Sequence, residues 1–242
     1  NGYSSKIIFN PHYEGIGFSR IKNLLHKPYG FLARSSIEKS SYIVCVSNYE
    51  KTALLKRFNI DEHKIQVIPN GINYQIPDIP LKRKIASNMN ILYVGRLEHY
   101  KGLQYVLQAL SLLNQKGMDF NLRIVGQGSY SKELRELTSR LNLHKVQFLG
   151  HVDDKKLEDL YASSDVFILL SQSESYGIVV AEALAHGLVT IVAKTTALSE
   201  FLEFEGCIGL DYPPNVTQLA SLLGSFVNKG VAVGPFNCCK IR

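Results

Sequence analysis

Two glutamates, Glu174 and Glu182, stand eight positions apart around a turn and the start of a helix, a spacing suited to ligand binding. The apolar run 166–170 precedes them and predicts a buried strand, and a helix is predicted from about Gly177. That helix is apolar on every side, which is typical of a buried helix, and Glu182 is its one charge. No cation lies three or four positions from Glu182, so its carboxylate should face a cleft or a ligand, because burying an unpaired charge is costly.

The residues between the two glutamates predict an anion site. Tyr176, Gly177 and Ile178 lie where the predicted helix begins. The first backbone N–H groups of a helix have no partner within it, and the helix dipole adds a positive potential there. These N–H groups therefore suit a phosphate.

Two cations follow another predicted strand. Arg96 lies in the loop Gly95–Leu97, directly after the strand 90–94, and Lys101 comes five residues later, where the next helix opens. Arginine can bind two phosphate oxygens at once, and lysine adds a point charge. The pair suits a diphosphate, the alternative being two solvated side chains on a surface loop.

Together these motifs resemble the retaining glycosyltransferases of family 4, which belong to glycosyltransferase group 1 and have the GT-B fold. The resemblance rests on the two glutamates with Tyr-Gly-Ile between them, and on Gly-Arg-Leu followed by Lys-Gly. It implies that Glu174 contacts the donor sugar, Glu182 holds the nucleotide ribose, and the backbone of residues 176–178 holds phosphate. It also makes the residues Gly95, Arg96 and Lys101 the diphosphate clamp. The alternative is that Glu174 is an ordinary turn residue and Glu182 a solvated helix residue.

Three further residues are assigned from the same resemblance. Gly126 and Val152 follow the predicted strands 121–125 and 145–149, and comparable loops of the family border the nucleotide base. His12, in a Pro-His-Tyr loop after a short strand, matches the family's loop that faces the donor sugar, so it would contact the donor sugar or the acceptor. Tight turns explain Gly126 and Val152 equally well, and a lone histidine is commonly an ordinary loop residue. The expected catalytic residues are Glu174, Arg96, Lys101 and His12.

No metal or other cofactor is expected. Asp153 and Asp154 are adjacent rather than spaced as Asp-x-Asp, and one of them should cap the helix 155–162. No Gly-x-Gly-x-x-Gly motif indicates a dinucleotide, and the four cysteines lack zinc spacing, which favours a reducing compartment. Arg96, Lys101 and the helix start near residue 177 can neutralise a departing diphosphate without a metal.

Strands alternate with helices in the second part of the chain. Strands are predicted at 90–94, 121–125, 145–149, 166–170, 189–193 and 207–210, and helices at 102–115, 130–141, 154–162, 177–187, 197–203 and 215–227. Such alternation implies a parallel sheet covered on both faces, with ligands at the carboxyl ends of its strands. Earlier strands are predicted at 6–9, 42–46 and 65–68, and a capping box of Ser47 and Glu50 opens a helix that runs to Phe58.

The expected fold is therefore α/β, a GT-B-like arrangement of two Rossmann-type parallel-sheet domains. A Pro-rich stretch and a basic patch mark the boundary between them. We expect part of an acceptor-side domain at 1–71, a linker at 72–88, the nucleotide-sugar-binding domain at 89–228 and an irregular tail at 229–242. Because the family's first strands and glycine-rich loop are not found before residue 6, we expect an N-terminally truncated chain with an incomplete first domain. Such a chain should bind a nucleoside diphosphate and transfer sugar poorly or not at all.

The net charge of +6 is unevenly distributed. Residues 1–87 hold 13 basic and 6 acidic side chains, whereas residues 88–242 hold 14 and 15. This argues against a general nucleic-acid-binding protein. It indicates instead that the basic first part of the chain contacts one local anionic surface of a partner. The basic amphipathic segment 19–39 suits either peripheral contact with an anionic membrane or packing on its own domain. No apolar run approaches the ~20 residues of a membrane span and no signal peptide is recognised, so we expect the cytoplasm or its membrane face.

The function that the resemblance implies is that of a hexosyltransferase of polysaccharide or glycolipid biosynthesis. It would move a sugar from a nucleotide diphosphate donor to a hydroxyl of a glycan or lipid-linked acceptor, with retention of the anomeric configuration. The alternative is a non-catalytic nucleotide- or phosphate-binding module, a degenerate or regulatory relative. Such a module needs Arg96 and Lys101 but neither Glu174 nor His12. Glu174 and His12 therefore discriminate between a transferase and a binding module.

Overall fold

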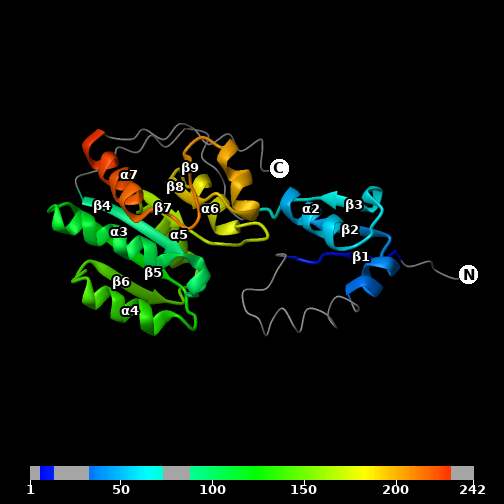
Figure 1. Cartoon of the computed structure of the whole chain (residues 1–242), viewed down its shortest axis with the longest axis horizontal. Helices are drawn as coiled ribbons and strands as arrows, with labels where there is room; N and C mark the ends of the chain where they lie inside the picture. The colour runs from blue at the N-terminus through cyan, green and yellow to red at the C-terminus, as the bar shows by residue number, and fades with distance from the viewer. Residues whose placement is uncertain (1–5, 14–32, 73–87, 230–242) are drawn as a thin grey trace, which may run out of the picture.

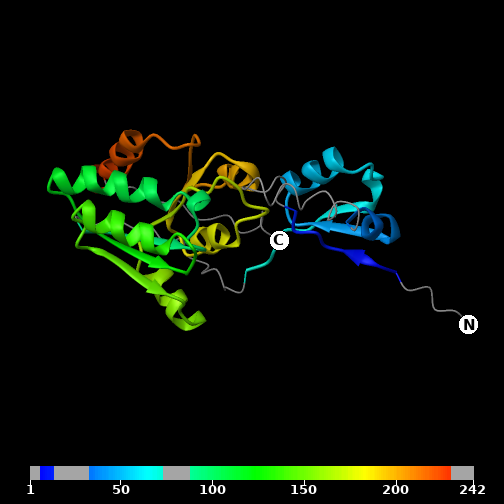
Figure 2. The same cartoon turned by 60° about the horizontal axis from the view of Figure 1, so that its bottom comes forward.

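The computed structural model describes residues 6–13, 33–72 and 88–229 of the 242-residue chain. They form two α/β units that lie side by side along the long axis of the molecule (Figures 1 and 2). The smaller unit comes first in the sequence, and the larger one holds all the predicted site residues except His12.

The larger unit is built on a six-stranded parallel sheet with the order β6-β5-β4-β7-β8-β9. Its strands are β4 (Asn88–Val94), β5 (Asp119–Val125), β6 (Val146–Gly150), β7 (Val166–Leu169), β8 (Val189–Ala193) and β9 (Cys207–Leu210). The chain runs outward from β4 to β6 and then returns to place β7 on the other side of β4. The carboxyl ends of β4 and β7 therefore form the switch point where ligands of such sheets bind.

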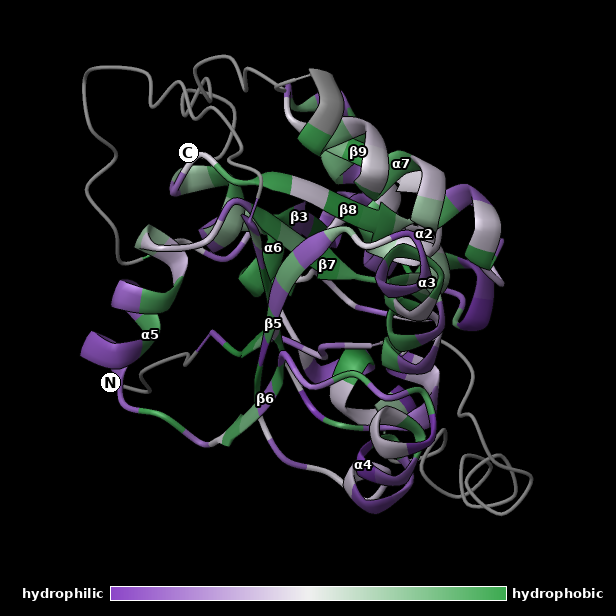
Figure 3. Ribbon diagram, turned by 90° about the vertical axis from the view of Figure 1, so that its left-hand side faces the viewer, coloured by the Kyte–Doolittle hydropathy of each residue, from purple (hydrophilic) through white to green (hydrophobic). Residues whose placement is uncertain are grey.

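Helices cover both faces of this sheet, as predicted. They are η2 (His99–Lys101), α3 (Leu103–Gln115), α4 (Ser131–Arg140), α5 (Asp154–Ala162), α6 (Ile178–Ala185), η3 (Thr196–Glu203) and α7 (Val216–Lys229). Figure 3 shows α5 and α6 on one side of the sheet and α3, α4 and α7 on the other. Every residue of β7 and β8 is buried, which explains why these strands are uninterrupted apolar runs.

Local details differ from the predictions at a few positions. The helix expected at 197–203 is a 3-10 helix, η3, and α7 extends through Lys229, the first residue of the predicted tail. Helix α6 is not buried all round, because Ile178 at its start is 40% exposed. Of the two adjacent aspartates, Asp153 is the cap of α5 and accepts a hydrogen bond from the backbone N–H of Lys156 at 2.7 Å.

The smaller unit is a parallel sheet with the order β1-β2-β3. Its elements are β1 (Ile8–Phe9), β2 (Tyr42–Cys45), α2 (Asn48–Arg57), η1 (Glu62–Lys64) and β3 (Ile65–Val67). Residues 33–39 are also helical, and Ile37 is buried against Ile43 and Leu54 in the core of this unit. The end of the basic segment thus packs on its own domain.

The predicted capping box at the start of α2 is only half correct. Ser47 Oγ does accept a hydrogen bond from the backbone N–H of Glu50, at 3.0 Å. The Glu50 carboxylate, however, accepts from the backbone N–H groups of Val46 and Tyr13. Glu50 is fully buried, and burial raises the pKa of its carboxyl group. It therefore fixes the loop after β1 to the end of β2 and the start of α2.

Several predictions fall on residues outside the described ranges. The basic segment is described only from residue 33, the linker only at its two ends, and the tail only at its first residue. In the described part of the chain, no helix has the length and apolar character needed to cross a membrane.

Candidate functional site

The loops after β4 and β5 are packed tightly against each other at the carboxyl edge of the larger sheet. The N–H of Gly95 donates to the carbonyl of Val125 at 3.0 Å. A Cβ atom on Gly126 would lie 1.9 Å from the carbonyl oxygen of Gly95, so only glycine fits there. This close packing accounts for the glycine at 126 without a ligand. Val152, in the loop after β6, is half-buried against the core of the larger unit.

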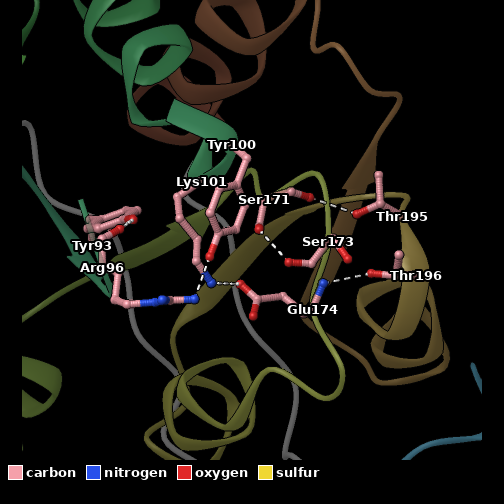
Figure 4. A network of polar contacts seen from close by, with 9 residues as sticks. All are labelled: Tyr93, Arg96, Tyr100, Lys101, Ser171, Ser173, Glu174, Thr195 and Thr196. Carbon is pink, nitrogen blue, oxygen red and sulfur yellow. Dashed lines mark hydrogen bonds and ion pairs between the residues drawn. The ribbon is translucent and has the colours of Figure 1, made fainter. Parts of the chain in front are cut away.

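Arg96 is exposed at the edge of the site and is held by two tyrosines. Its Nη2 donates to the hydroxyl oxygen of Tyr100 at 2.6 Å, and its carbonyl accepts from the hydroxyl of Tyr93 at 2.8 Å (Figure 4). Tyr93 is fully buried, and burial raises the pKa of its hydroxyl group. The Arg96 guanidinium is therefore oriented from within the larger unit. Neither tyrosine was identified from the sequence.

Lys101 and Glu174 form an ion pair across the switch point. Lys101 Nζ lies 2.6 Å from Glu174 Oε1, and the two side chains are only 9% and 13% exposed. The sequence predicted both residues, but their pairing depends on β4 and β7 being neighbours. Gly102 makes the approach possible, because a Cβ atom there would lie 2.0 Å from the carbonyl oxygen of Leu170.

Residues 171–177 form what we call the donor loop, after the role that the family resemblance implies for it. The loop is fixed by two threonines that follow β8. Thr195 Oγ1 donates to the carbonyl of Ser171 at 2.7 Å, and the N–H of Glu174 donates to Thr196 Oγ1 at 2.9 Å (Figure 4). Within the loop, Ser171 Oγ donates to the carbonyl of Ser173 at 3.0 Å. The sequence analysis missed both threonines, although their place directly after a predicted strand puts them at the same sheet edge.

The start of α6 has no side-chain cap among the residues that the structure describes. Gly177 has φ 101° and ψ 52°, a left-handed conformation that favours glycine, and it has no side chain that could cap the helix. Tyr176 is nearly buried, and its ring lies 5.5 Å from that of Phe201, so the ring packs in the core of the larger unit. Ile178 is the first helical residue, so its N–H group belongs to the first turn of α6.

Glu182 is not the unpaired carboxylate that the sequence predicted. Its Oε2 accepts a hydrogen bond at 2.8 Å from the hydroxyl of Tyr161, which comes from α5. Burial raises the pKa of the Glu182 carboxyl group, and this hydrogen bond opposes the rise. The helical neighbours of Glu182 are indeed uncharged, but its partner comes from another helix. Glu182 thus pairs with α5, while Glu174 pairs with Lys101.

His12 is exposed, and its backbone is left-handed with φ 47°. No hydrogen bond or ion pair joins it to Glu174 among the residues that the structure describes. The link is indirect: Glu50 binds the N–H of Tyr13 and donates its own N–H to Ser47 Oγ, which donates to the carbonyl of Ser175 at 2.6 Å. The loop after β1 is therefore connected to the donor loop through α2.

A second contact between the two units involves Glu200 of η3. Its carboxylate accepts from the backbone N–H of Asn48 at 3.2 Å and of Tyr49 at 2.7 Å, so it caps α2 from the other unit. Glu200 and Asn48 also line a cavity of about 160 Å³ between the units, together with Tyr176.

We expect the substitution Glu200→Ala to lower the free energy of unfolding by about 1 kcal/mol, because the first amides of α2 lose their cap and their nearby negative charge. Thermal and urea unfolding measure this change. The matched control is Glu205→Ala, which removes an exposed carboxylate a few residues away. Equal stability of the two variants would show that Glu200 does not stabilise the contact between the units.

Two family models match successive parts of the chain. The model of the glycosyl transferases of group 1 matches residues 79–230, which is more than half of the chain. The model of glycosyltransferase family 4 matches residues 3–75.

Curated relatives include glycosyltransferases of varied kinds. An uncharacterised glycosyltransferase of Methanocaldococcus jannaschii is 34% identical over 197 residues, which cover 76% of this chain and 50% of that protein. Glycogen synthase of Mycobacterium tuberculosis is 30% identical over 199 residues, covering 81% of this chain and 47% of that enzyme. The chain thus spans about half the length of the curated relatives it matches.

Solved structures share the fold. HepE of Anabaena, determined with UDP and glucose, has a TM-score of 0.74 at 21% identity, over 93% of this chain and 62% of that one. WaaG, a glycosyltransferase involved in lipopolysaccharide biosynthesis, has a TM-score of 0.75 at 18% identity, over 92% of this chain and 66% of that one. The predicted GT-B-like fold is confirmed by these likenesses.

Proposed function

The chain belongs to the glycosyl transferases of group 1, and on that premise we propose that it acts on a nucleoside diphosphate sugar. The proposed reaction moves the sugar to a hydroxyl group of a glycan or lipid-linked acceptor, with retention of the anomeric configuration. The observation that carries the proposal is the Lys101–Glu174 pair at the switch point of the sheet. It holds the cation that we propose binds phosphate within one hydrogen bond of the carboxylate that we propose contacts the sugar.

Each residue of the site has a role in the proposed reaction. Arg96 and Lys101 bind the diphosphate, and the first N–H groups of α6 add partial positive charge. When the bond from the anomeric carbon to the diphosphate oxygen breaks, these groups stabilise the negative charge that the diphosphate takes up. The acceptor hydroxyl attacks the same face of the sugar and passes its proton to the departing diphosphate. Glu174 orients the donor sugar, and His12 contacts the donor sugar or the acceptor from the smaller unit.

The proposal is tested first by thermal unfolding with a panel of nucleoside diphosphates and their sugars. A ligand that binds only the folded state raises stability by an amount that grows with the ratio of its concentration to its dissociation constant. At equal concentration, the nucleotide whose base binds most tightly should therefore raise the melting temperature most. UDP and UDP-glucose lead the panel, because the related HepE structure contains UDP and glucose. If no member of the panel stabilises the chain, the proposed donor class is wrong.

Turnover separates this proposal from the alternative of a non-catalytic binding module. The donor that stabilises the chain should also be cleaved slowly, and Glu174→Ala should abolish that cleavage while nucleotide binding persists. Binding without any cleavage would favour the module.

Running the same assay with a chelator tests the expected independence of metal. Within the described ranges, no cluster of three His, Cys, Asp or Glu side chains forms a metal site.

Ribose binding by Glu182 is tested by the substitution Glu182→Gln. If the carboxylate accepts hydrogen bonds from the ribose hydroxyls, nucleotide affinity should fall about tenfold, the scale of a hydrogen bond to a charged group. The Tyr161 hydroxyl can still donate to the glutamine oxygen, so the fold should be retained. Calorimetry with the 2′-deoxy and 3′-deoxy nucleotides supplies the control, because each should bind the unsubstituted chain less well and lose less on substitution. Equal losses for all three nucleotides would contradict the ribose role.

A further inference from the structure

We infer that Tyr100 is a positioning residue that fixes both cations of the diphosphate clamp. This inference rests on the proposed function, because it concerns how the clamp binds the donor's diphosphate. Tyr100 lies between Arg96 and Lys101 in the sequence, at the carboxyl edge of the sheet, and Figure 4 shows its side chain beside those of both cations.

The two cations contact different parts of the Tyr100 side chain. Arg96 Nη2 donates to the hydroxyl oxygen at 2.6 Å, with the guanidinium carbon 6.0 Å from the ring centre. Lys101 Nζ lies 5.2 Å from the ring centre, within the range of a cation–π contact. The hydroxyl therefore orients Arg96, and the electron-rich ring stabilises the ammonium of Lys101.

The loop after β7 holds the backbone of Tyr100 in place. Its carbonyl accepts a hydrogen bond from the N–H of Gln172 at 2.8 Å, which fixes η2 to the donor loop. Two residues later, Gly102 lies so close to the carbonyl of Leu170 that no side chain fits. The position of the Tyr100 ring is thus set by the same β4–β7 junction that brings Lys101 to Glu174.

This arrangement prepares the clamp for a ligand with two phosphates. Two cations close to each other repel. Glu174 offsets part of that cost at Lys101, and the ring and hydroxyl of Tyr100 offset a further part before a ligand arrives. One of the five N–H donors of Arg96 is occupied by Tyr100, which leaves the others for phosphate oxygens in a fixed orientation. A side chain that is already ordered loses less entropy on binding, so Tyr100 should increase affinity for the diphosphate.

Calorimetry with a nucleoside diphosphate and the matching monophosphate tests the inference. For Tyr100→Phe, which keeps the ring and removes the hydroxyl, the diphosphate should bind about fivefold more weakly. For Tyr100→Ala, which removes the ring as well, the loss should reach roughly 30-fold. In both variants the monophosphate should lose less affinity than the diphosphate, because the second phosphate depends most on two correctly placed cations. A general loss of structure would weaken both nucleotides alike.

A double-mutant cycle and a matched control sharpen the test. In an Arg96→Ala background, Tyr100→Phe should have little further effect, since the hydroxyl then has no guanidinium to orient. The control is Tyr105→Phe, on the first turn of α3, where the ring packs edge-on against Tyr212. It should leave both affinities unchanged.

The outcomes distinguish the inference from the proposed function. If the unsubstituted chain binds no nucleoside diphosphate, the proposed function fails and the inference fails with it. Suppose instead that the unsubstituted chain binds the diphosphate. If both Tyr100 variants then bind it as tightly as the unsubstituted chain, or lose equal affinity for the diphosphate and the monophosphate, only the inference is overturned. Selective weakening of the diphosphate, with additivity lost in the Arg96→Ala background, supports it.

Discussion

Replacing Lys101 with alanine should weaken nucleoside diphosphate binding by about 10- to 100-fold, the scale of a charge-assisted contact in a poorly solvated site. The Lys101 side chain is only 9% exposed, so water screens its charge little. Arg96→Ala should cost less, because Arg96 lies at the exposed edge of the site. The two losses should not add, because both cations bind the same diphosphate and both contact Tyr100.

Lys101→Ala should also lower the free energy of unfolding by about 2 kcal/mol, because it leaves the Glu174 carboxylate without its partner in a site that excludes most water. Affinity is therefore measured by calorimetry at a temperature where the variant is fully folded. Lys116→Ala is the matched control, since Lys116 is an exposed lysine just beyond the end of α3. Unchanged diphosphate affinity in both Lys101→Ala and Arg96→Ala would remove the basis for a diphosphate clamp.

The course of the chain through the larger unit was predictable because its signals are local. Apolar runs such as 166–169 and 189–193 are buried on both faces, and the helices between them have their own periodicity and caps. The positions of the motif residues Arg96, Lys101 and Glu174 at the carboxyl edge of the sheet were predictable for a related reason: each lies in a loop after a strand or at the opening of the next helix. Strand ends of a parallel sheet meet at one edge, so these residues had to lie near each other.

The partners that these residues choose were not predictable, because they depend on which strands and helices become neighbours. Tyr161 is 21 positions from Glu182 in the sequence, and only the packing of α5 beside α6 brings its hydroxyl to the carboxylate. Glu50 has the spacing of a capping-box residue, yet its carboxylate accepts hydrogen bonds from the backbone N–H groups of Val46 and Tyr13 instead. The sequence does not distinguish Tyr100 from any other loop tyrosine, because its contacts form only when η2 packs against the donor loop. A carboxylate or hydroxyl binds whichever donor or acceptor the tertiary structure presents in the buried state, and sequence spacing does not contain that information.

Glu174→Gln should have opposite effects on product binding and on catalysis. In the free protein Glu174 neutralises Lys101 at 2.6 Å, so a diphosphate must share that cation with the carboxylate and is repelled by it. Glutamine has the same shape without the charge, so the nucleoside diphosphate should bind about tenfold more tightly. Cleavage of the donor sugar should fall by about 100-fold or more, because the charged contact to the sugar is lost.

Stability measurements identify the cause of the tighter binding. Without Glu174 the nearly buried ammonium of Lys101 has lost its counterion, so the free variant should unfold at a lower temperature than the unsubstituted chain. The diphosphate supplies the missing negative charge, so a saturating concentration should raise the melting temperature of the variant by more than it raises that of the unsubstituted chain. Glu158→Gln, which neutralises an exposed carboxylate on α5, is the control and should change neither quantity. Should diphosphate affinity fall together with cleavage in Glu174→Gln, the carboxylate would be a direct support of the clamp rather than a competitor for Lys101.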